Sequence, residues 1–215
     1  DTYGWGGIGI EVLTDSQLVL ERSALLTNIE GGLVATNIEG GVGGLLAGTS
    51  VEVRDSIIAH TQVSADGAFG RGIQTQTGAS LIVERSVIID NNEAAIFIWE
   101  AFGDIRDTLL ADTKVSGNHG AGDGLLVTMS EVTANGVVAT RNGRVGVLYD
   151  RTIGEISNCS ITENAFGLAT QGTDVPTISE DNAVVDNTKN VVENNDLPIP
   201  DTPMALPQED NTSNE

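Results

Sequence analysis

The 215-residue sequence is poor in cysteine and aromatic residues, and it has no long hydrophobic run. A single cysteine, Cys159, excludes an internal disulfide bond. Because aromatic residues make up only 4% of the chain, a hydrophobic core has to be built from aliphatic side chains. No apolar stretch reaches the length of a transmembrane helix, so membrane insertion is not expected.

Basic residues are also scarce, with 10 against 31 acidic residues and a formal net charge of −21. Such a surface repels phosphate backbones and anionic membranes, so nucleic acid is not an expected partner. It is compatible with divalent cations, salty media or cationic ligands. The simplest interpretation is the solubility of an extracellular protein. The start at Asp1, without an initiator Met, predicts a mature form or an excised piece of a longer chain.

The residues that are abundant favour β-structure. Val, Ile, Leu and Ala dominate the apolar residues, and 26 glycines punctuate them. Short aliphatic segments separated by glycine are typical of many short strands. No segment keeps a 3.6-residue apolar period over three turns, which argues against a helical solenoid.

An internal duplication is visible at an offset of 63 residues. Residues 7–28 and 70–91 align without gaps, and nine of the 22 positions are identical. The match includes the segment Glu21-Arg22-Ser23, which returns as Glu84-Arg85-Ser86. Self-similarity at a fixed period predicts a repeat architecture.

A shorter unit of about 22 residues, with insertions, runs through the chain. Each copy closes on a polar residue, at Asn28, Thr61, Asn91, Thr113, Arg141 (beside Asn142), Asn164 and Asn187. Three residues earlier comes an aliphatic residue, at Leu25, Ile58, Ile88, Leu110, Val138, Ile161 and Val184. Five residues before the close come Ser23, Ser56, Ser86, Thr108, Gly136, Cys159 and Asn182. Eight residues before it come Leu20, Val53, Val83, Ile105, Thr133, Ile156 and Ser179.

This unit predicts one coil of a parallel β-helix. Three short strands per coil would stack equivalent residues into columns about 4.8 Å apart. Asn and Thr at the tight bends would hydrogen-bond along the axis. Cys159 shares its column with Ser23, which predicts a small structural residue rather than a nucleophile.

With these repeats, residues 7 to 190 resemble the right-handed parallel β-helix repeat proteins of the pectate-lyase-like superfamily, in particular its large secreted bacterial members. The resemblance implies an all-β, right-handed parallel β-helix of about seven coils of roughly 22 residues with loop insertions. The predicted division is a β-helix over residues 1–190 and an acidic, proline-containing flexible tail or linker over residues 191–215.

Two equal loops are the best candidate for a ligand site. Residues 61–72 and 113–124 agree at five of 12 positions and lie two coils apart. Side chains of both loops are therefore expected to project into one neighbourhood, roughly 10 Å across. The residues concerned are Asp66, Arg71, Asn118, His119 and Asp123, with Tyr3 and Trp5 nearby. The alternative is ordinary turn chemistry, since Gly, Asp and Asn are common turn residues.

Two aromatic residues and one metal are further candidates. Trp99 could offer a flat platform to a sugar ring, or pack at an edge of the fold. Tyr149 lies in a basic patch between Arg144 and Arg151 and could contact a sugar, or belong to a turn. No cofactor is predicted. Calcium is a weak possibility at Asp66 and Asp123, because no known calcium-loop motif is present.

The scaffold that the resemblance implies carries lyases, hydrolases, adhesins and stalks alike. Of the motifs it implies for polygalacturonase-like hydrolases, only residues 117–120 resemble Gly-His-Gly, with one extra residue inside. The leading hypothesis is therefore a non-catalytic extracellular or cell-surface module of a bacterium: a stalk, an adhesin or a glycan-contacting surface. The alternative is a polysaccharide lyase or glycoside hydrolase with a divergent site in the paired loops. A third possibility is end-to-end self-association through exposed strand edges.

Overall fold

The computed structural model of the chain describes residues 7–37, 48–65, 67–116, 120–193 and 196–200. These residues form 22 strands and no helix. It follows that the described part of the chain holds no helix that could span a membrane. The strands assemble into three parallel sheets, called A, B and C in the order in which the chain first visits them.

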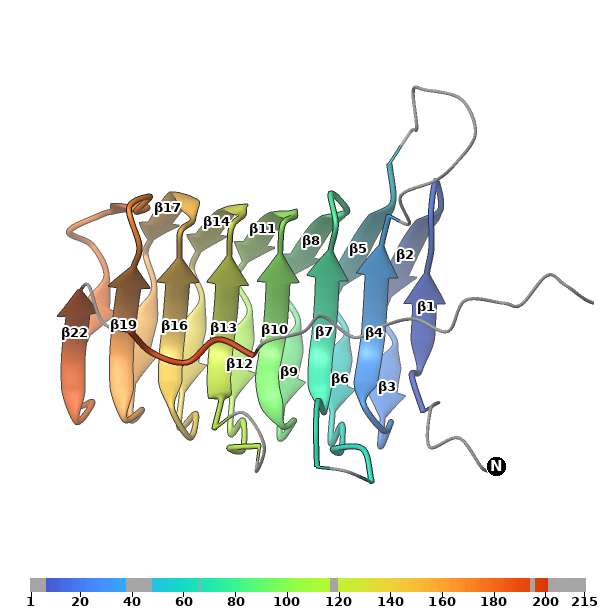
Figure 1. Cartoon of the computed structure of the whole chain (residues 1–215), viewed down its shortest axis with the longest axis horizontal. Coiled ribbons are helices and arrows are strands. Elements are labelled where there is room, and N and C mark those ends of the chain that lie inside the picture. The colour runs from blue at the N-terminus through green and yellow to red at the C-terminus, as the bar shows by residue number, and fades with distance from the viewer. Residues whose placement is uncertain (1–6, 38–47, 66, 117–119, 194–195, 201–215) are drawn as a thin grey trace, which may run out of the picture.

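Each coil contributes one strand to each sheet, so that the three sheets are the sides of one solenoid (Figure 1). Sheet A contains β1 (Ile10–Val12), β4 (Gly31–Thr36), β7 (Arg71–Gln76), β10 (Glu93–Trp99), β13 (Gly122–Thr128), β16 (Val145–Asp150), β19 (Phe166–Gln171) and β22 (Lys189–Glu193). Sheet B contains β2 (Gln17–Glu21), β5 (Ser50–Arg54), β8 (Ser80–Glu84), β11 (Phe102–Arg106), β14 (Glu131–Asn135), β17 (Ile153–Ser157) and β20 (Thr177–Ile178). Sheet C contains β3 (Ala24–Leu26), β6 (Ile57–Ala59), β9 (Val87–Ile89), β12 (Leu109–Ala111), β15 (Val138–Thr140), β18 (Ser160–Thr162) and β21 (Ala183–Val184). The predicted right-handed parallel β-helix is confirmed.

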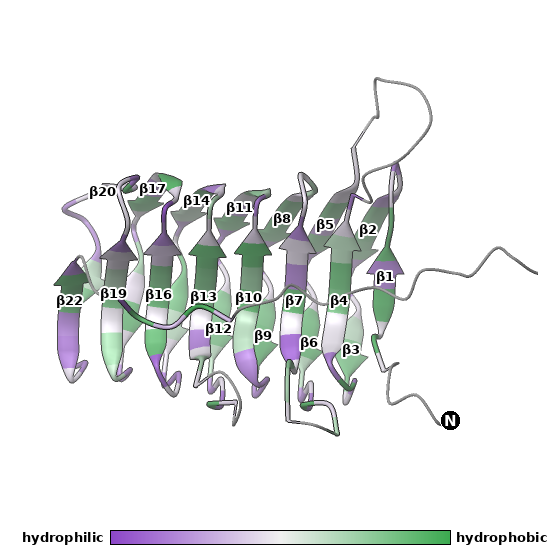
Figure 2. Cartoon of the chain, viewed as in Figure 1, coloured by the Kyte–Doolittle hydropathy of each residue, from purple (hydrophilic) through white to green (hydrophobic). Residues whose placement is uncertain are grey.

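Equivalent side chains of successive coils lie above one another inside the solenoid. Leu25, Ile58, Ile88 and Leu110 are consecutive partners in sheet C. The duplication has the same register, because Ile10 and Ile73 both pair with Leu33 in sheet A. Aliphatic residues fill this interior. Figure 2 shows that hydrophobic residues are concentrated along the strands. The column arrangement predicted from the sequence is confirmed in these coils.

The fifth copy of the repeat differs from the prediction by one residue. Ala139, not Val138, pairs with Leu110 and faces the interior. The copy closes on Asn142 rather than Arg141, because the Asn142 side-chain oxygen accepts the N–H of Thr113 at 3.2 Å.

The same shift moves the other columns of that copy. Ala134 stands where Thr133 was expected, and Val137 where Gly136 was expected. In the last copy Ile178, not Ser179, pairs with Ile156, because the turn to β21 is one residue longer than in the preceding coil.

The polar residues at the corner between sheets C and A form a ladder. The side-chain oxygen of Asn164 accepts the N–H of Asn142 at 2.8 Å, and Asn187 does the same for Asn164 at 2.9 Å. The side-chain oxygen of Asn91 likewise accepts the N–H of Thr61 at 3.0 Å. The residue before each of these turns the backbone with a positive φ, as at Asp90 (φ 53). These bonds satisfy backbone groups that a corner otherwise leaves unpaired.

Cys159 occupies the column predicted for it. Its N–H donates to the side-chain oxygen of Asn182 at 2.9 Å, and its thiol donates to the carbonyl of Ser157 at 3.2 Å. The side chain is buried, and burial raises the pKa of the thiol. A protonated, buried thiol is a poor nucleophile.

After β22 the chain turns back across the outer face of sheet A. Residues 196–200, called the strap below, cross β19, β16 and β13 (Figure 1). Leu197 exchanges two hydrogen bonds with the side-chain amide of Gln171, at 3.0 and 3.1 Å. The described part of residues 191–215 thus departs from the predicted flexible tail: residues 191–193 belong to β22 and the strap packs on the sheet.

Candidate functional site

The loop residues predicted to bind a ligand are buried where the structure describes them. Arg71 lies on the outer face of sheet A with no exposed surface, and its Nε donates to Glu93 Oε2 at 2.7 Å. The guanidinium also stacks on Phe97, 4.1 Å from the ring centroid, and on Phe69 at 5.2 Å. Burial lowers the pKa of Arg71, and Glu93 opposes this effect. The surroundings of Arg71 are therefore those of a residue that stabilises the fold.

Asp123 is equally buried and belongs to a different ion pair. Arg144 Nε donates to its Oδ1 at 2.8 Å, and the Val145 N–H donates to the same atom at 3.1 Å. Burial raises the pKa of Asp123, while these hydrogen bonds act in the opposite direction. Arg71 and Asp123 were expected to project into one neighbourhood, and they lie in β7 and β13 of sheet A with only β10 between them. Each is held by its own ion-pair partner, and the ligand site in the paired loops stays a prediction.

The remaining loop candidates, Asp66, Asn118, His119, Tyr3 and Trp5, lie outside the described residues. In the described parts of the two loops, the equivalent serines each donate their N–H to a carbonyl further along the loop. The Ser64 N–H donates to the Ala68 carbonyl at 2.9 Å, and the Ser116 N–H donates to the Ala121 carbonyl at 2.8 Å. The two acceptors are not equivalent in the loop alignment, in which Ala68 corresponds to Gly120.

Tyr149 points into the solenoid and not toward a ligand. It is fully buried, its hydroxyl donates to the Val132 carbonyl at 3.3 Å, and burial raises its pKa. The sugar contact predicted for Tyr149 is therefore corrected. Trp99 ends β10 on the outer face of sheet A, half-buried, and packs against the apolar cluster that contains Phe97 and Leu126. It takes the edge-packing role that was the alternative for it.

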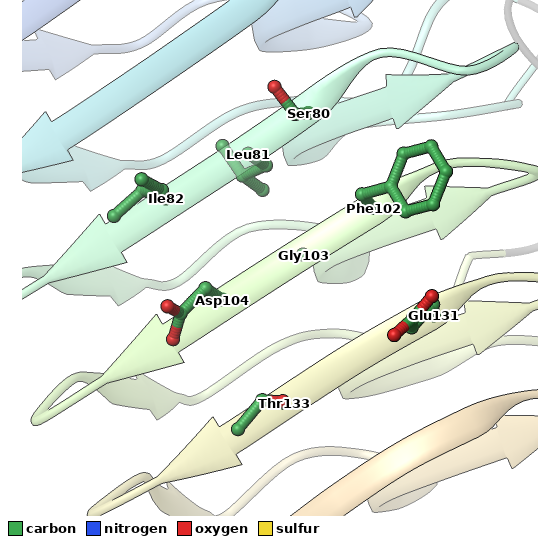
Figure 3. A pocket seen from close by; sticks show the side chains of 8 residues that line it. All are labelled: Ser80, Leu81, Ile82, Phe102, Gly103, Asp104, Glu131 and Thr133. Carbon is green, nitrogen blue, oxygen red and sulfur yellow. The ribbon is translucent and has the colours of Figure 1, made fainter.

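A shallow groove on the outer face of sheet B is the best candidate site (Figure 3). This hollow of about 280 Å³ is lined by Ser80, Leu81, Ile82, Phe102, Gly103, Asp104, Glu131 and Thr133. Successive residues of a strand point to opposite faces, so the side chains of Leu81 and Val132 belong to the core although Leu81 also borders the groove, and their neighbours along the strands face the groove. Phe102 is 53% exposed, which is unusual for so large an apolar side chain.

The register of sheet B brings the groove residues together. Phe102 pairs with Ser80 on one side and with Glu131 on the other. Figure 3 shows the side chains of Phe102 and Glu131 on neighbouring strands. Glu131 in turn pairs with Ile153, which is also exposed. One outward column over four coils therefore carries a hydroxyl, an aromatic ring, a carboxylate and an aliphatic side chain, from Ser80, Phe102, Glu131 and Ile153 in that order.

A second hollow lies next to the first on the side of the C-terminal coils, at the turns that lead into β14 and β17. It has a volume of about 500 Å³ and is lined by Met129, Ser130, Arg151, Ile153, Thr173 and Asp174. The two hollows share no lining residue, but Ile153 of the second pairs with Glu131 of the first, so the hollows are neighbours on successive coils. Together they are called the axial groove below. Its shape suits an extended ligand rather than a compact one.

The charges in the axial groove are mostly negative. Asp104 is paired with Arg106, whose Nε donates to Oδ1 at 2.8 Å. Arg151 is paired with Asp150, at 2.7 Å between Nη2 and Oδ2. Among the described residues, Glu131 has no hydrogen-bond or ion-pair partner for its carboxylate, so it is available to a ligand.

A charged hollow of about 700 Å³ at the corner between sheets C and A is a second candidate. His60 Nδ1 lies 2.6 Å from Asp90 Oδ2, and Lys114 Nζ pairs with the other oxygen of Asp90. The bond from Lys114 lowers the pKa of Asp90, against the effect of its partial burial. Arg141 forms two bonds of 2.8 Å with Asp112 beside them.

Neither candidate was predicted from the sequence. His60, Asp90, Asp112 and Arg141 each stand one residue before the ladder of Asn and Thr, a signal that the repeat alignment already contained. Within the described ranges, no three His, Cys, Asp or Glu side chains gather as a metal ion requires. For the weak calcium possibility, Asp66 is outside those ranges and Asp123 is occupied by Arg144.

Comparison with protein-family models, with curated proteins and with solved structures finds no match to this chain. The parallel β-helix is established by the strands themselves. The resemblance to the pectate-lyase-like superfamily stays a prediction.

Proposed function

We propose that this chain is a non-catalytic β-helix module of a bacterial cell surface or secreted protein, and that it binds an extended glycan along the axial groove. The observation that carries the proposal is the exposed ring of Phe102 between the hydroxyl of Ser80 and the carboxylate of Glu131. A sugar ring has an apolar face and a rim of hydroxyl groups. An aromatic platform flanked by hydrogen-bonding groups matches both.

The direction of the groove supports a polymeric ligand. Its two hollows extend from β8 to the turn after β19, so that a chain of sugars can lie along the rod and contact successive coils. Parallel strands also hold these side chains on a rigid surface, which lowers the entropy cost of binding. The acidic composition is in keeping with an extracellular location.

A polysaccharide lyase or glycoside hydrolase is the second candidate, and the corner hollow favours it. Asp90 orients His60 through Nδ1, which leaves Nε2 of His60 as a base or acid, with Lys114 close by. Glycoside hydrolysis requires two carboxyl groups that can act on the substrate. In this hollow, Asp90 and Asp112 are both paired with cations.

The test is binding to a panel of neutral, anionic and cationic polysaccharides by affinity electrophoresis and calorimetry. We expect retention by at least one class, and a loss of affinity of about tenfold in Phe102→Ala. The matched control is Val19→Ala, which removes an apolar side chain that is 60% exposed on the same sheet but outside the groove. A folded protein that binds none of the panel would overturn the proposal.

The same preparations distinguish the second candidate. Release of reducing ends, or of products that absorb as unsaturated uronates, would identify an enzyme. If His60→Gln abolished such activity while Phe102→Ala kept it, the corner hollow would replace the axial groove as the functional site.

A further inference from the structure

We propose that the glycan bound by the axial groove carries protonated amino groups, as a polymer of amino sugars does. This inference rests on the proposed function and adds the chemical class of the ligand. It is argued from the distribution of charge along the groove and from the ring of Phe102.

The cations of the groove are already neutralised within the protein. Arg106 is bound to Asp104, and Arg151 to Asp150. What remains is acidic: Glu131 lies in the groove, Asp174 lines its far end, and Glu155 stands on the strand between them. All three are exposed. The groove therefore offers carboxylates with no matching positive charge in the part of the chain that the structure describes.

These carboxylates belong to successive coils. Glu131 is in β14, Glu155 in β17, and Asp174 follows β19. Glu131 pairs with Ile153, and Glu155, two residues further along β17, pairs with Thr133. The three carboxylates therefore form a staggered row over successive coils, which repeat at about 4.8 Å along the axis, and not a single column. A ligand with one positive charge per repeating unit is complementary to such a row. A ligand with a single charge uses only one member of it.

The three glycan classes differ in how they meet this surface. A polymer of uronic acids would be repelled by the row and by the net charge of −21. A neutral polymer would gain hydrogen bonds, but no Coulombic energy. An ammonium group would form charge-assisted hydrogen bonds with the carboxylates, which are roughly twice as strong as neutral ones.

The aromatic ring favours the same ligand. Glu131 is the direct neighbour of Phe102 in the sheet, so an amino sugar stacked on the ring would bring its ammonium group close to the carboxylate. The face of the ring also attracts a cation. Phe102 and Glu131 would thus act on one sugar unit, one through its ring and the other through its amine.

The experiment compares a β-1,4-linked glucosamine oligomer with its fully N-acetylated counterpart, which has the same backbone without the charges. Calorimetry is run with the whole chain, at a pH at which the amines are protonated, in about 50 mM and about 500 mM salt. We expect the glucosamine oligomer to bind at least about tenfold more tightly in low salt, with most of this preference lost in high salt.

Two variants show whether the preference belongs to the groove. Glu131→Gln should reduce the preference several-fold, whereas Glu11→Gln, which removes the same charge from an exposed position in β1 of sheet A, should leave it unchanged. An equal effect of both would reduce the preference to general attraction by an acidic protein and overturn the inference. If the two oligomers bound equally well and Phe102→Ala weakened both to the same extent, the inference of an amino-sugar ligand would be overturned. The proposed function would still stand. No binding of any glycan would overturn both.

Discussion

At the scale of single residues, the direction of a side chain decides whether it belongs to the core or to the surface. Val138 and Ala139 are adjacent in β15, but Val138 is 38% exposed and Ala139 is fully buried. Ala139 lies between Leu110 and Ile161 in the interior column. At Gly154 the backbone, and not the side-chain direction, restricts the residue type. Its φ of 133 disfavours other residues, and the carbonyl of Val132 occupies the space that a Cβ atom would need.

The pair Val138 and Ala139 gives a direct test of the register. Ala139→Lys would place a charge in the apolar interior and should destabilise the protein by more than about 3 kcal/mol. Val138→Lys, one residue away, should change the free energy of unfolding by no more than about 0.5 kcal/mol. Urea unfolding followed by circular dichroism measures both. A larger loss in Val138→Lys would mean that sheet C has the other register.

The sequence predicts most of this register but not the fifth copy. There Arg141 and Asn142 are both polar and adjacent, and periodicity alone does not distinguish them. The distinction comes from hydrogen bonding, since the side chain of Asn142 reaches Thr113 whereas Arg141 bonds Asp112 outside the coil. A residue pattern records which side chains alternate, and it does not record which of two polar residues turns inward.

At the scale of elements, the ladder of Asn and Thr ties each coil to the next. Asn164 shows how this is done: its Oδ1 accepts the N–H of Asn142, and its Nδ2 donates to the carbonyls of Ala139 and Thr162 at 3.1 and 2.8 Å. One side chain thus satisfies backbone groups of two coils at a sharp corner. The corner is buried, so unmet groups there have no access to water.

Removing the Asn164 side chain should therefore be costly. Asn164→Ala leaves several backbone groups unsatisfied and should lower the free energy of unfolding by about 1–3 kcal/mol. Asn164→Thr should cost less, because Thr occupies the same column at Thr61 and Thr113. Hydrogen exchange at the amide of Asn142 provides a local measurement. Unchanged protection of that amide in Asn164→Ala would contradict the assigned role of the ladder.

The axial groove is also a property of elements, which explains why the sequence did not predict it. Phe102 and Glu131 are 29 residues apart, although they are neighbours in the sheet. The loop over residues 112–121, between β12 and β13, lengthens this coil, so a 22-residue repeat does not align the two residues. The outward positions also carry no constraint from packing, and their pattern is irregular. Only the register across loops of different length brings them together.

At the scale of the whole molecule, the three sides of the solenoid are treated differently. The outer face of sheet B is open to solvent at Phe102 and Ile153, whereas that of sheet A is largely buried and carries an apolar cluster beside buried ion pairs. Phe97, Leu126 and Leu148 form a column on sheet A, and Leu197 and Ile199 of the strap pack against their cluster. The proline-rich, acidic composition of this region suggested a flexible tail. The pair of aliphatic residues two positions apart, Leu197 and Ile199, indicates instead a segment that packs against an apolar surface.

The strap should contribute to stability through these two side chains. The double variant Leu197→Ser with Ile199→Ser should lower the free energy of unfolding by about 2 kcal/mol, since both side chains are half-buried. It should also increase the fluorescence of a dye that binds exposed apolar surface. Asp196→Ser, at an exposed position of the same segment, is the control. Identical thermal unfolding of all three proteins would show that the strap is not a stabilising element.

The reversal of the chain after β22 also determines how the rod responds to tension. A force applied to the last strand of a sheet breaks its hydrogen bonds one at a time, so that the force needed is small. A pull that arrives through Pro200 meets the strap first, where Leu197 is held by Gln171 and by the apolar face of sheet A. These contacts are loaded together and in shear. The terminal coil is thereby protected from unwinding by a segment that forms no strand itself.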